Sequence, residues 1–110
     1  MSMVEAETVT QAAVFAALGD PVRLNLLSRL DQGRPQSITV MTEGTGLTRQ
    51  AVAKHLKVLE RAGVVSPSKA GREQHYAVQV RALVAAEAYL QQVTGKWDQA
   101  LTRLRAHLER

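Results

Sequence analysis

The strongest constraint on the fold is an amphipathic segment between Thr48 and Gly63. Val52, Leu56 and Leu59 recur there at i, i+4 and i+7, which places them in one stripe of a helix. Thr48 is a favourable N-cap and Gly63 a favourable residue to end a helix. The pattern predicts a helix over 49–62 that is buried along one side. The opposite pole of that helix is polar and mostly basic, carrying Gln50, Lys54, Lys57 and Arg61.

A shorter helix is predicted immediately before this segment. Ser37 is a favourable N-cap for a helix over 38–43, and Gly44-Thr45-Gly46 then interrupts it. A turn between two such helices often needs a residue in the left-handed region, which Gly46 can adopt at no steric cost. The short helix, the turn and the long helix together predict a helix-turn-helix over about 37–62.

A β-hairpin is predicted after the long helix. Two β-type runs, 64–68 and 72–78, are separated by a glycine-containing loop at 69–71. Pro67 has no amide hydrogen to donate, so the first run is either short or at a sheet edge. Tyr76 and Val78 share one face of the second run, and we expect them to point into the core. A hairpin in this place, about 64–78, is typical of a winged helix-turn-helix.

Hydrophobic periodicity also predicts four flanking helices, at 8–18, 21–32, 81–92 and 94–109. Asp20 and Pro21 are a good N-cap and first residue for the second of them. At 110 residues the chain has the usual size of one domain. We therefore predict a mainly α fold with a small β-hairpin: a single winged helix-turn-helix domain over 1–110, with about six helices and a two-stranded wing.

Positive charge is concentrated in the middle of the chain. The formal net charge is +4, yet residues 49–72 alone hold six basic residues and one acid. A local excess of this kind is the electrostatic footprint of a surface that binds a polyanion such as nucleic acid. On charge alone, a solvated helix face with a chance asymmetry is an equally good interpretation.

Composition excludes several other classes of protein. The chain has no cysteine, so it has no disulfide framework, thiol nucleophile or thiolate metal site. No apolar run approaches the roughly 20 residues that span a bilayer. The first ten residues lack the basic and apolar regions of a signal peptide. From these features we expect a soluble cytoplasmic protein.

Four motifs resemble the ArsR-type winged helix-turn-helix repressors. The most distinctive is Gly-Leu-Thr-Arg-Gln-Ala-Val-Ala-Lys-His-Leu at 46–56. The others are Leu-Gly-Asp-Pro-Val-Arg-Leu at 18–24, Ala-Gly-Val-Val at 62–65 and Gly-Arg-Glu-Gln-His-Tyr at 71–76. The resemblance covers about residues 12–98. It implies a homodimer, joined through the first and last helices, that binds a palindromic operator, represses transcription and often regulates its own operon.

The candidate DNA-binding residues lie on the long helix and the hairpin. Arg49, Gln50 and Lys54 are expected to read bases, because Arg and Lys suit guanine and Gln suits adenine. Thr48 is expected to cap the helix and also to offer its hydroxyl to a phosphate. The complete set of candidates is Thr48, Arg49, Gln50, Ala51, Lys54, His55, Lys57, Lys69 and Arg72.

Two residues near this set have competing interpretations. His55 projects near the apolar stripe, which suggests a half-buried structural histidine, whereas the family resemblance implies a phosphate contact. Both interpretations stay open. Arg23 lies outside the basic segment, and we expect it to be structural rather than a DNA contact.

The last predicted helix carries a narrow apolar seam. Trp97, Leu101, Leu104 and Leu108 recur at i, i+4, i+7 and i+11 on an otherwise polar helix. Such a seam belongs either to the core of the chain or to a dimer interface, and we favour the interface. Val14 and Leu18 of the first helix are expected to join it.

The sequence predicts no metal, no cofactor and no catalytic residues, and hence no enzyme. Metal-sensing ArsR members carry a Cys-Val-Cys-type motif in the helix matching 38–43, or Asp and His pairs on a C-terminal helix. Residues 38–43 have no Cys, and 81–92 have neither His nor Asp. The inducer is therefore not implied by the resemblance.

Two alternatives to a DNA-binding repressor remain open at this point. The chain could be a winged-helix protein-interaction module that has lost DNA binding. It could also be a sensor gated by an unidentified small ligand or by a metal held between subunits, for example by His75, His107 and acidic residues.

Overall fold

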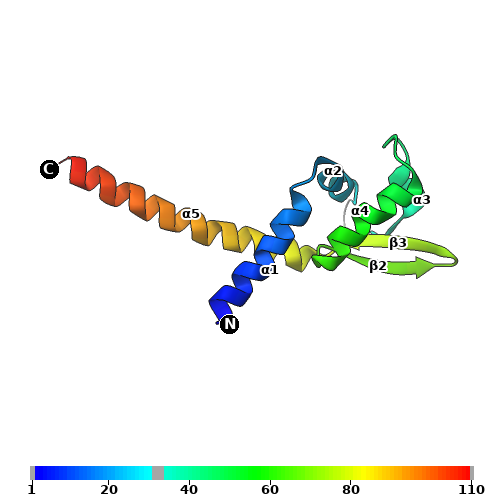
Figure 1. Ribbon diagram of the computed structural model, residues 1–110, viewed down its shortest axis with the longest axis horizontal. Coiled ribbons are helices and arrows are strands. Elements are labelled where there is room, and N and C mark those ends of the chain that lie inside the picture. The colour runs from blue at the N-terminus through cyan, green and yellow to red at the C-terminus, as the bar shows by residue number, and fades with distance from the viewer. Residues whose placement is uncertain (1, 31–33, 110) are drawn as a thin grey trace.

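The structure, a computed structural model, describes residues 2–30 and 34–109. Its elements are α1 (Met3–Leu18), α2 (Pro21–Arg29), β1 (Gln36–Ser37), α3 (Ile38–Thr42), α4 (Arg49–Arg61), β2 (Val65–Ala70), β3 (Glu73–Val78) and α5 (Val80–Leu108). The molecule is elongated, with principal extents of 67 × 32 × 22 Å. The helices α2 to α4 and the hairpin form one end, and α5 runs away from them to the C-terminus (Figure 1). The predicted fold class, a mainly helical winged helix-turn-helix, is confirmed.

The core is organised around α4. Val52, Leu56 and Leu59 are all fully buried, as the stripe predicted. They belong to one cluster with Leu26 of α2 and Met41 of α3. Residues that follow α4 complete this cluster, namely Val64, Val65 and Tyr76. Because α1, α2, α3 and β2 pack against one face of α4, the opposite face is left in solvent.

The helix-turn-helix forms as the sequence predicted. The Ser37 hydroxyl accepts the Val40 amide at 3.1 Å and starts α3, and Thr48 Oγ1 accepts the Ala51 amide at 3.0 Å and starts α4. Gly46 has φ +71°, in the left-handed region that the turn was expected to require. Both helix starts and the turn between them are therefore fixed by local chemistry.

The wing differs in detail from the prediction. β2 and β3 pair from Val65↔Val78 to Ala70↔Glu73, so Lys69 is a strand residue opposite Gln74 and the turn is residues 71–72. A third strand, β1, pairs with Tyr76 and His75 of β3 and was not predicted, because two residues carry no periodic signal. The strand order is β1-β3-β2, which leaves β2 with its Pro67 at the edge, as expected.

The helices at the two ends are longer than predicted. α1 begins at Met3 rather than near residue 8, with the Ser2 hydroxyl accepting the Glu5 amide at 3.2 Å. The expected break between 92 and 94 is wrong, because α5 is one helix of 29 residues that includes Gly95. The described part of the chain thus has five helices instead of about six. One glycine costs only about 1 kcal/mol in a helix, too little by itself to end one of this length. The expected end of the second helix, 31–32, lies outside the described residues.

A polar junction joins α1, α2 and α4. The Asp20 carboxylate accepts the Arg23 amide at 3.0 Å and starts α2. The Arg23 side chain donates to the carbonyls of Ala17 at 2.7 Å and Ala16 at 3.3 Å, so it caps the end of α1. Arg23 is therefore structural, as expected. His55 of α4 completes the junction, with Nδ1 3.9 Å from Asp20 Oδ2.

The junction lowers the pKa of Asp20 below its ordinary value of 3.8. The largest cause is the hydrogen bond from the Arg23 backbone amide, and the positive charges of Arg23 and His55 act in the same direction. Partial burial of the carboxylate opposes these effects by raising the pKa.

Replacing Gly46 in the turn and Gly95 in α5 with alanine should change the stability of the fold in opposite directions. Neither has any atom within 4 Å of the position of an added Cβ, so only the backbone decides. Gly46→Ala should destabilise the fold by about 1–2 kcal/mol, because alanine is strained in the left-handed region. Gly95→Ala should stabilise it by up to about 1 kcal/mol, because alanine favours a continuous helix. Urea unfolding of the wild type and both variants at one protein concentration measures these changes in the free energy of unfolding. A destabilised Gly95→Ala would contradict the single α5.

The lowered pKa of Asp20 predicts a pH dependence of stability. Its ionised form is stabilised by folding, so this contribution is present above pH 3.8 and is lost as pH falls through the lower folded-state pKa. Asn caps a helix as well as Asp but does not titrate, so Asp20→Asn is the matched variant. Urea unfolding at several pH values should show the wild type more stable at pH 7 and the difference shrinking below about pH 4. If the difference in unfolding free energy between the wild type and Asp20→Asn stayed constant down to pH 2, the charge of Asp20 would contribute nothing to stability.

Candidate nucleic-acid interface

The candidate DNA-binding side chains lie on α4 and on the outer part of the wing. Those exposed to solvent are Thr48, Arg49, Gln50, Lys54, Lys57, Lys69 and Arg72. Ala51 and His55, both on α4, are half-buried. The hairpin packs against α4 at its inner end, near Val65, so Lys69 lies four residues, or about 13 Å, further out along β2. The candidates therefore form two groups, one on α4 and one near the wing tip; Figure 1 shows where these two elements lie.

Thr48 can serve both roles expected of it. Its Oγ1 accepts the Ala51 amide, which uses the oxygen as an acceptor and leaves the hydroxyl hydrogen free. A phosphate at the start of α4 would accept that hydrogen and would also face the unpaired amides of the first helical turn. Capping and phosphate binding by Thr48 are therefore compatible.

The basic residues of α4 differ in their partners. Lys57 Nζ lies 3.5 Å from Glu60 Oε1 on the same helix, so part of its charge is already compensated. No carboxylate of residues 2–30 and 34–109 lies within 4.0 Å of Arg49, Lys54, Lys69 or Arg72. The uncompensated positive charge of α4 therefore lies at Arg49 and Lys54 in its first two turns and at Arg61 in its last turn.

His55 has both features that made its role ambiguous. Its side chain is 27% exposed and lies beside Asp20, which fits a half-buried structural histidine. The exposed part of the ring is still available to a ligand outside the chain. The ring lies beside Asp20 and is still partly open to solvent.

Side-chain hydrogen bonds that the sequence analysis missed hold the interface in place. Thr39 Oγ1 donates to Glu73 Oε1 at 2.9 Å and ties the wing to α3. Arg29 of α2 donates to the carbonyls of Met41 and Glu43 and caps the end of α3. No periodic or local signal marks these residues, because each contact joins elements that are distant in sequence.

Tyr76 connects the wing to α4 through the core. Its side chain is 2% exposed, and burial raises the pKa of its hydroxyl, with a further rise from the nearby Glu60 carboxylate. The phenol therefore stays neutral near pH 7, so Tyr76 itself adds no buried charge between the wing and α4.

The apolar seam of α5 is exposed over its second half. Trp97, Leu101, Leu104 and Leu108 are 67%, 48%, 53% and 73% exposed, so they are not part of the core of this chain. The same face of the helix begins with Leu83 and Ala86, which pack into the core, and continues through the exposed Leu90 and Val93. One continuous apolar stripe is thus covered at its start and uncovered towards the C-terminus.

The first helix contributes less to this surface than the sequence suggested. Val14 is 3% exposed and lies in the core of its own chain, and its contribution to an interface with another chain stays a prediction. Leu18 is half-buried and packs against the same core. The exposed apolar residues of α1 are instead Met3, Val4 and Val9. α1 itself packs on α5, with the rings of Phe15 and Tyr89 6.3 Å apart.

The described part of the chain lacks two further features, a metal-binding cluster and a membrane-spanning helix. Residues 2–30 and 34–109 contain no group of three His, Asp or Glu side chains that could hold a metal ion. None of the helices in this part of the chain has the length and hydropathy needed to span a membrane.

Comparison with known proteins agrees with this geometry. Residues 18–67 match the family of the helix-turn-helix domain. The uncharacterised HTH-type transcriptional regulator YuzN of Bacillus subtilis is 38% identical over 66 residues, which cover 54% of this chain and 72% of that protein.

Solved structures extend the match to most of the chain. An ArsR-like transcriptional regulator from Rhodococcus sp. RHA1 has 33% identity and a TM-score of 0.79, covering 89% of this chain and 92% of that one. The homodimeric winged helix-turn-helix DNA-binding domain of Mb0332 from Mycobacterium bovis has 26% identity and a TM-score of 0.66, covering 87% and 89%. The fold, the helix-turn-helix and these relatives together show that the chain belongs to the ArsR family of winged helix-turn-helix transcriptional regulators.

Proposed function

We propose that this regulator is a homodimer that binds a palindromic operator in DNA and represses transcription. The observation that carries the proposal is the exposed, uncompensated basic face on the first two turns of α4. A helix with one buried side and one free cationic side fits the major groove of B-DNA, which admits a single α-helix. The M. bovis relative is a homodimeric DNA-binding domain of the same fold, which supports the proposal.

The two groups of candidate residues would make different contacts with DNA, one with bases and the other with phosphates. Arg49, Gln50 and Lys54 lie near the N-terminus of α4, where the side chains of a recognition helix usually reach base edges. Lys69 and Arg72 are near the wing tip, where flanking phosphates are the nearest targets. Lys57, already paired with Glu60, is placed for a phosphate contact further along the groove.

Dimerisation would cover the exposed stripe of α5. Four large apolar side chains at helical spacing, each about half or more exposed, form an apolar surface that a monomer rarely leaves in water. Pairing with the same stripe of a second copy would bury them in a two-fold interface. The exposed Met3, Val4 and Val9 of α1 would enlarge that interface.

The regulatory consequences follow from the family and the site. A dimer that occupies an operator blocks polymerase without any further contact, so repression needs only DNA binding. Autoregulation and a cytoplasmic location are the corresponding expectations for a bacterial-type repressor of this family. The role of His55 in this scheme is a phosphate contact held in place by Asp20.

Substitutions on α4 and on the wing should have different effects on DNA binding: the first on sequence preference, the second on the salt dependence of the affinity. Gln50→Ala should weaken operator binding by about 1–3 kcal/mol and relax the preference at one position of each half-site. Arg72→Ala should weaken binding to operator and to random DNA nearly equally. It should also lower the slope of log affinity against log salt by about one unit per lost phosphate contact, doubled in a dimer.

Fluorescence anisotropy with operator and scrambled duplexes across a salt series separates these effects. If Arg72→Ala changed the sequence preference while Gln50→Ala changed only the salt slope, the orientation on DNA would be wrong. If the folded wild type bound no duplex even at low salt, a protein-interaction module would be favoured instead.

The α5 stripe predicts the effect of a charge on assembly. Leu104→Asp should yield monomers or aggregates by light scattering and lose operator binding, because an unpaired charge would be buried in the interface. The milder Leu104→Ala should lower the stability of the dimer by about 2–5 kcal/mol per chain, because it truncates a side chain that the interface would bury. Ala106→Asp is the matched control, since it adds the same charge to the opposite face of the same exposed helix. A wild-type protein that binds DNA as a folded monomer would refute the dimer.

A further inference from the structure

We propose that Glu60 limits the affinity of this regulator for DNA by withholding the charge of Lys57 from phosphate. The inference rests on the proposed function, in which the outer face of α4 lies on DNA. Residues 49–72 hold six basic residues, and Glu60 is the one acid among them. Its carboxylate is therefore the single negative charge in the segment that would face a polyanion.

Glu60 is held between α4 and the base of the wing. Its side chain is 28% exposed, and Oε1 is shielded from solvent and accepts no hydrogen bond within the described part of the chain. Burial raises the pKa of the Tyr76 hydroxyl, and the charge of the neighbouring Glu60 carboxylate raises it further. The carboxylate is thus packed against the wing instead of extending into water.

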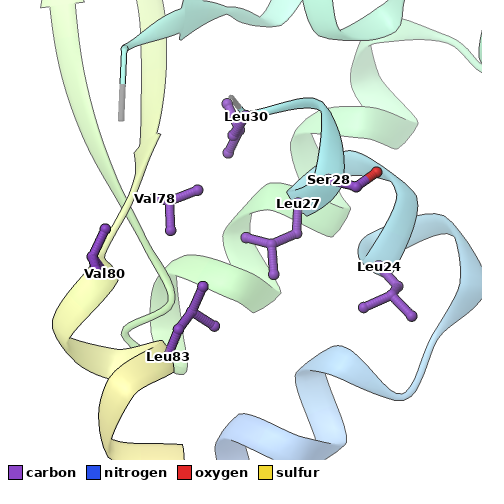
Figure 2. A pocket seen from close by; sticks show the side chains of 7 residues that line it. All are labelled: Leu24, Leu27, Ser28, Leu30, Val78, Val80 and Leu83. Atoms are coloured by element: carbon purple, nitrogen blue, oxygen red, sulfur yellow. The ribbon is translucent and has the colours of Figure 1, made fainter. Parts of the chain in front are cut away.

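Lys57 supplies the counter-charge of Glu60. Its Nζ lies 3.5 Å from Glu60 Oε1, and no other basic group of residues 2–30 and 34–109 lies within 4.0 Å of that carboxylate. The inner face of β3 continues from Tyr76 to Val78, which lines an apolar hollow between α2 and the start of α5 (Figure 2). That hollow is lined by Leu and Val side chains and Ser28, so it offers no cation either. Lys57 itself is 56% exposed, which leaves it within reach of a phosphate.

The stability of α4 does not account for an acid at this position. Glu60 is in the last turn of α4, where the negative end of the helix dipole disfavours a carboxylate. An ion pair along a helix is also weaker when the Lys precedes the Glu, as Lys57 does here. A residue that opposes local preferences on a functional surface points to a role in function.

DNA and Glu60 therefore compete for one lysine. When Lys57 turns to a phosphate, the shielded oxygen of Glu60 loses its counter-charge, and this cost offsets part of the phosphate contact. Glu60 thus acts through Lys57, as a positioning residue. Because phosphates carry no sequence information, the affinity is lowered for operator and random DNA by the same factor.

The test replaces Glu60 with glutamine, which removes the charge and keeps a side chain of the same shape beside Tyr76. Affinity for a fluorescein-labelled duplex of random sequence is measured by anisotropy across a salt series. Glu60→Gln should bind about two- to fivefold more tightly per chain, the usual range for an exposed ion pair, and hence about four- to twenty-five-fold as a dimer. The slope of log affinity against log salt should steepen by up to about two units, one for each regained phosphate contact. Glu109→Gln is the matched control, since it removes the same charge from the exposed far end of α5 (Figure 1) and should change neither quantity.

Lys57→Met separates competition for the lysine from direct repulsion of DNA. In this background Glu60→Gln should change the affinity by less than about twofold, because the two residues act as one pair. Lys57→Met alone should weaken binding to random DNA less than Lys54→Met does, because no described carboxylate lies within 4.0 Å of Lys54. This second comparison leaves Glu60 in place, so it stands even if urea unfolding shows that Glu60→Gln is poorly folded.

An unchanged or lower affinity of a folded Glu60→Gln would overturn the inference. So would a gain of the same size in the Lys57→Met background, since Glu60 would then act on DNA directly. A changed sequence preference among sites selected from random duplexes would show that Glu60 orients α4, and would overturn the inference as well. A wild type that binds no duplex at low salt contradicts the proposed function instead, and the same titration reports that outcome separately.

Discussion

The burial of one stripe of α4 is the constraint on which the rest of the structure depends. Val52, Leu56 and Leu59 are fully excluded from water, and full burial of each such side chain contributes about 1.5–3 kcal/mol. With this face fixed against α2, α3 and the sheet, the rotation of α4 about its axis is fixed as well. The cationic residues at the opposite pole are then held in solvent without needing contacts of their own. The core of this small domain therefore determines which surface α4 presents to solvent.

Local chemistry made the centre of the fold predictable from the sequence. The starts of α3 and α4 depend on hydroxyls that bond to amides three residues later, and the turn depends on a glycine in the left-handed region. These interactions lie within a few residues of one another, so residue type and spacing reveal them. The same holds for the edge position of β2, which follows from Pro67. The outer face of α4 was predictable for a related reason, because helical geometry alone relates it to the buried stripe.

The features that were missed depend on tertiary structure. β1 exists only because β3 is available to pair with it, and α5 continues through Gly95, whose cost of about 1 kcal/mol is too small to end a helix of 29 residues. Val14 has the spacing of an interface residue, but packing of α1 against α5 and the core buries it within its own chain. Thr39–Glu73 and the contacts of Arg29 join distant segments, and no sequence pattern marks them. The seam on α5 was predictable as apolar, whereas its exposure became clear only from the direction of the helix, which runs away from the body (Figure 1).

The central claim is that α4 of a symmetric dimer reads DNA sequence. Selection of binding sites from a pool of random duplexes by the purified protein tests this most directly, because it assumes no operator. We predict enrichment of an inverted repeat, with half-sites centred about 10–10.5 base pairs apart or a multiple of that spacing. Enrichment of a single unpaired half-site would contradict the dimer. Recovery of no preferred sequence, at a salt concentration where the protein still binds DNA, would contradict base reading by α4.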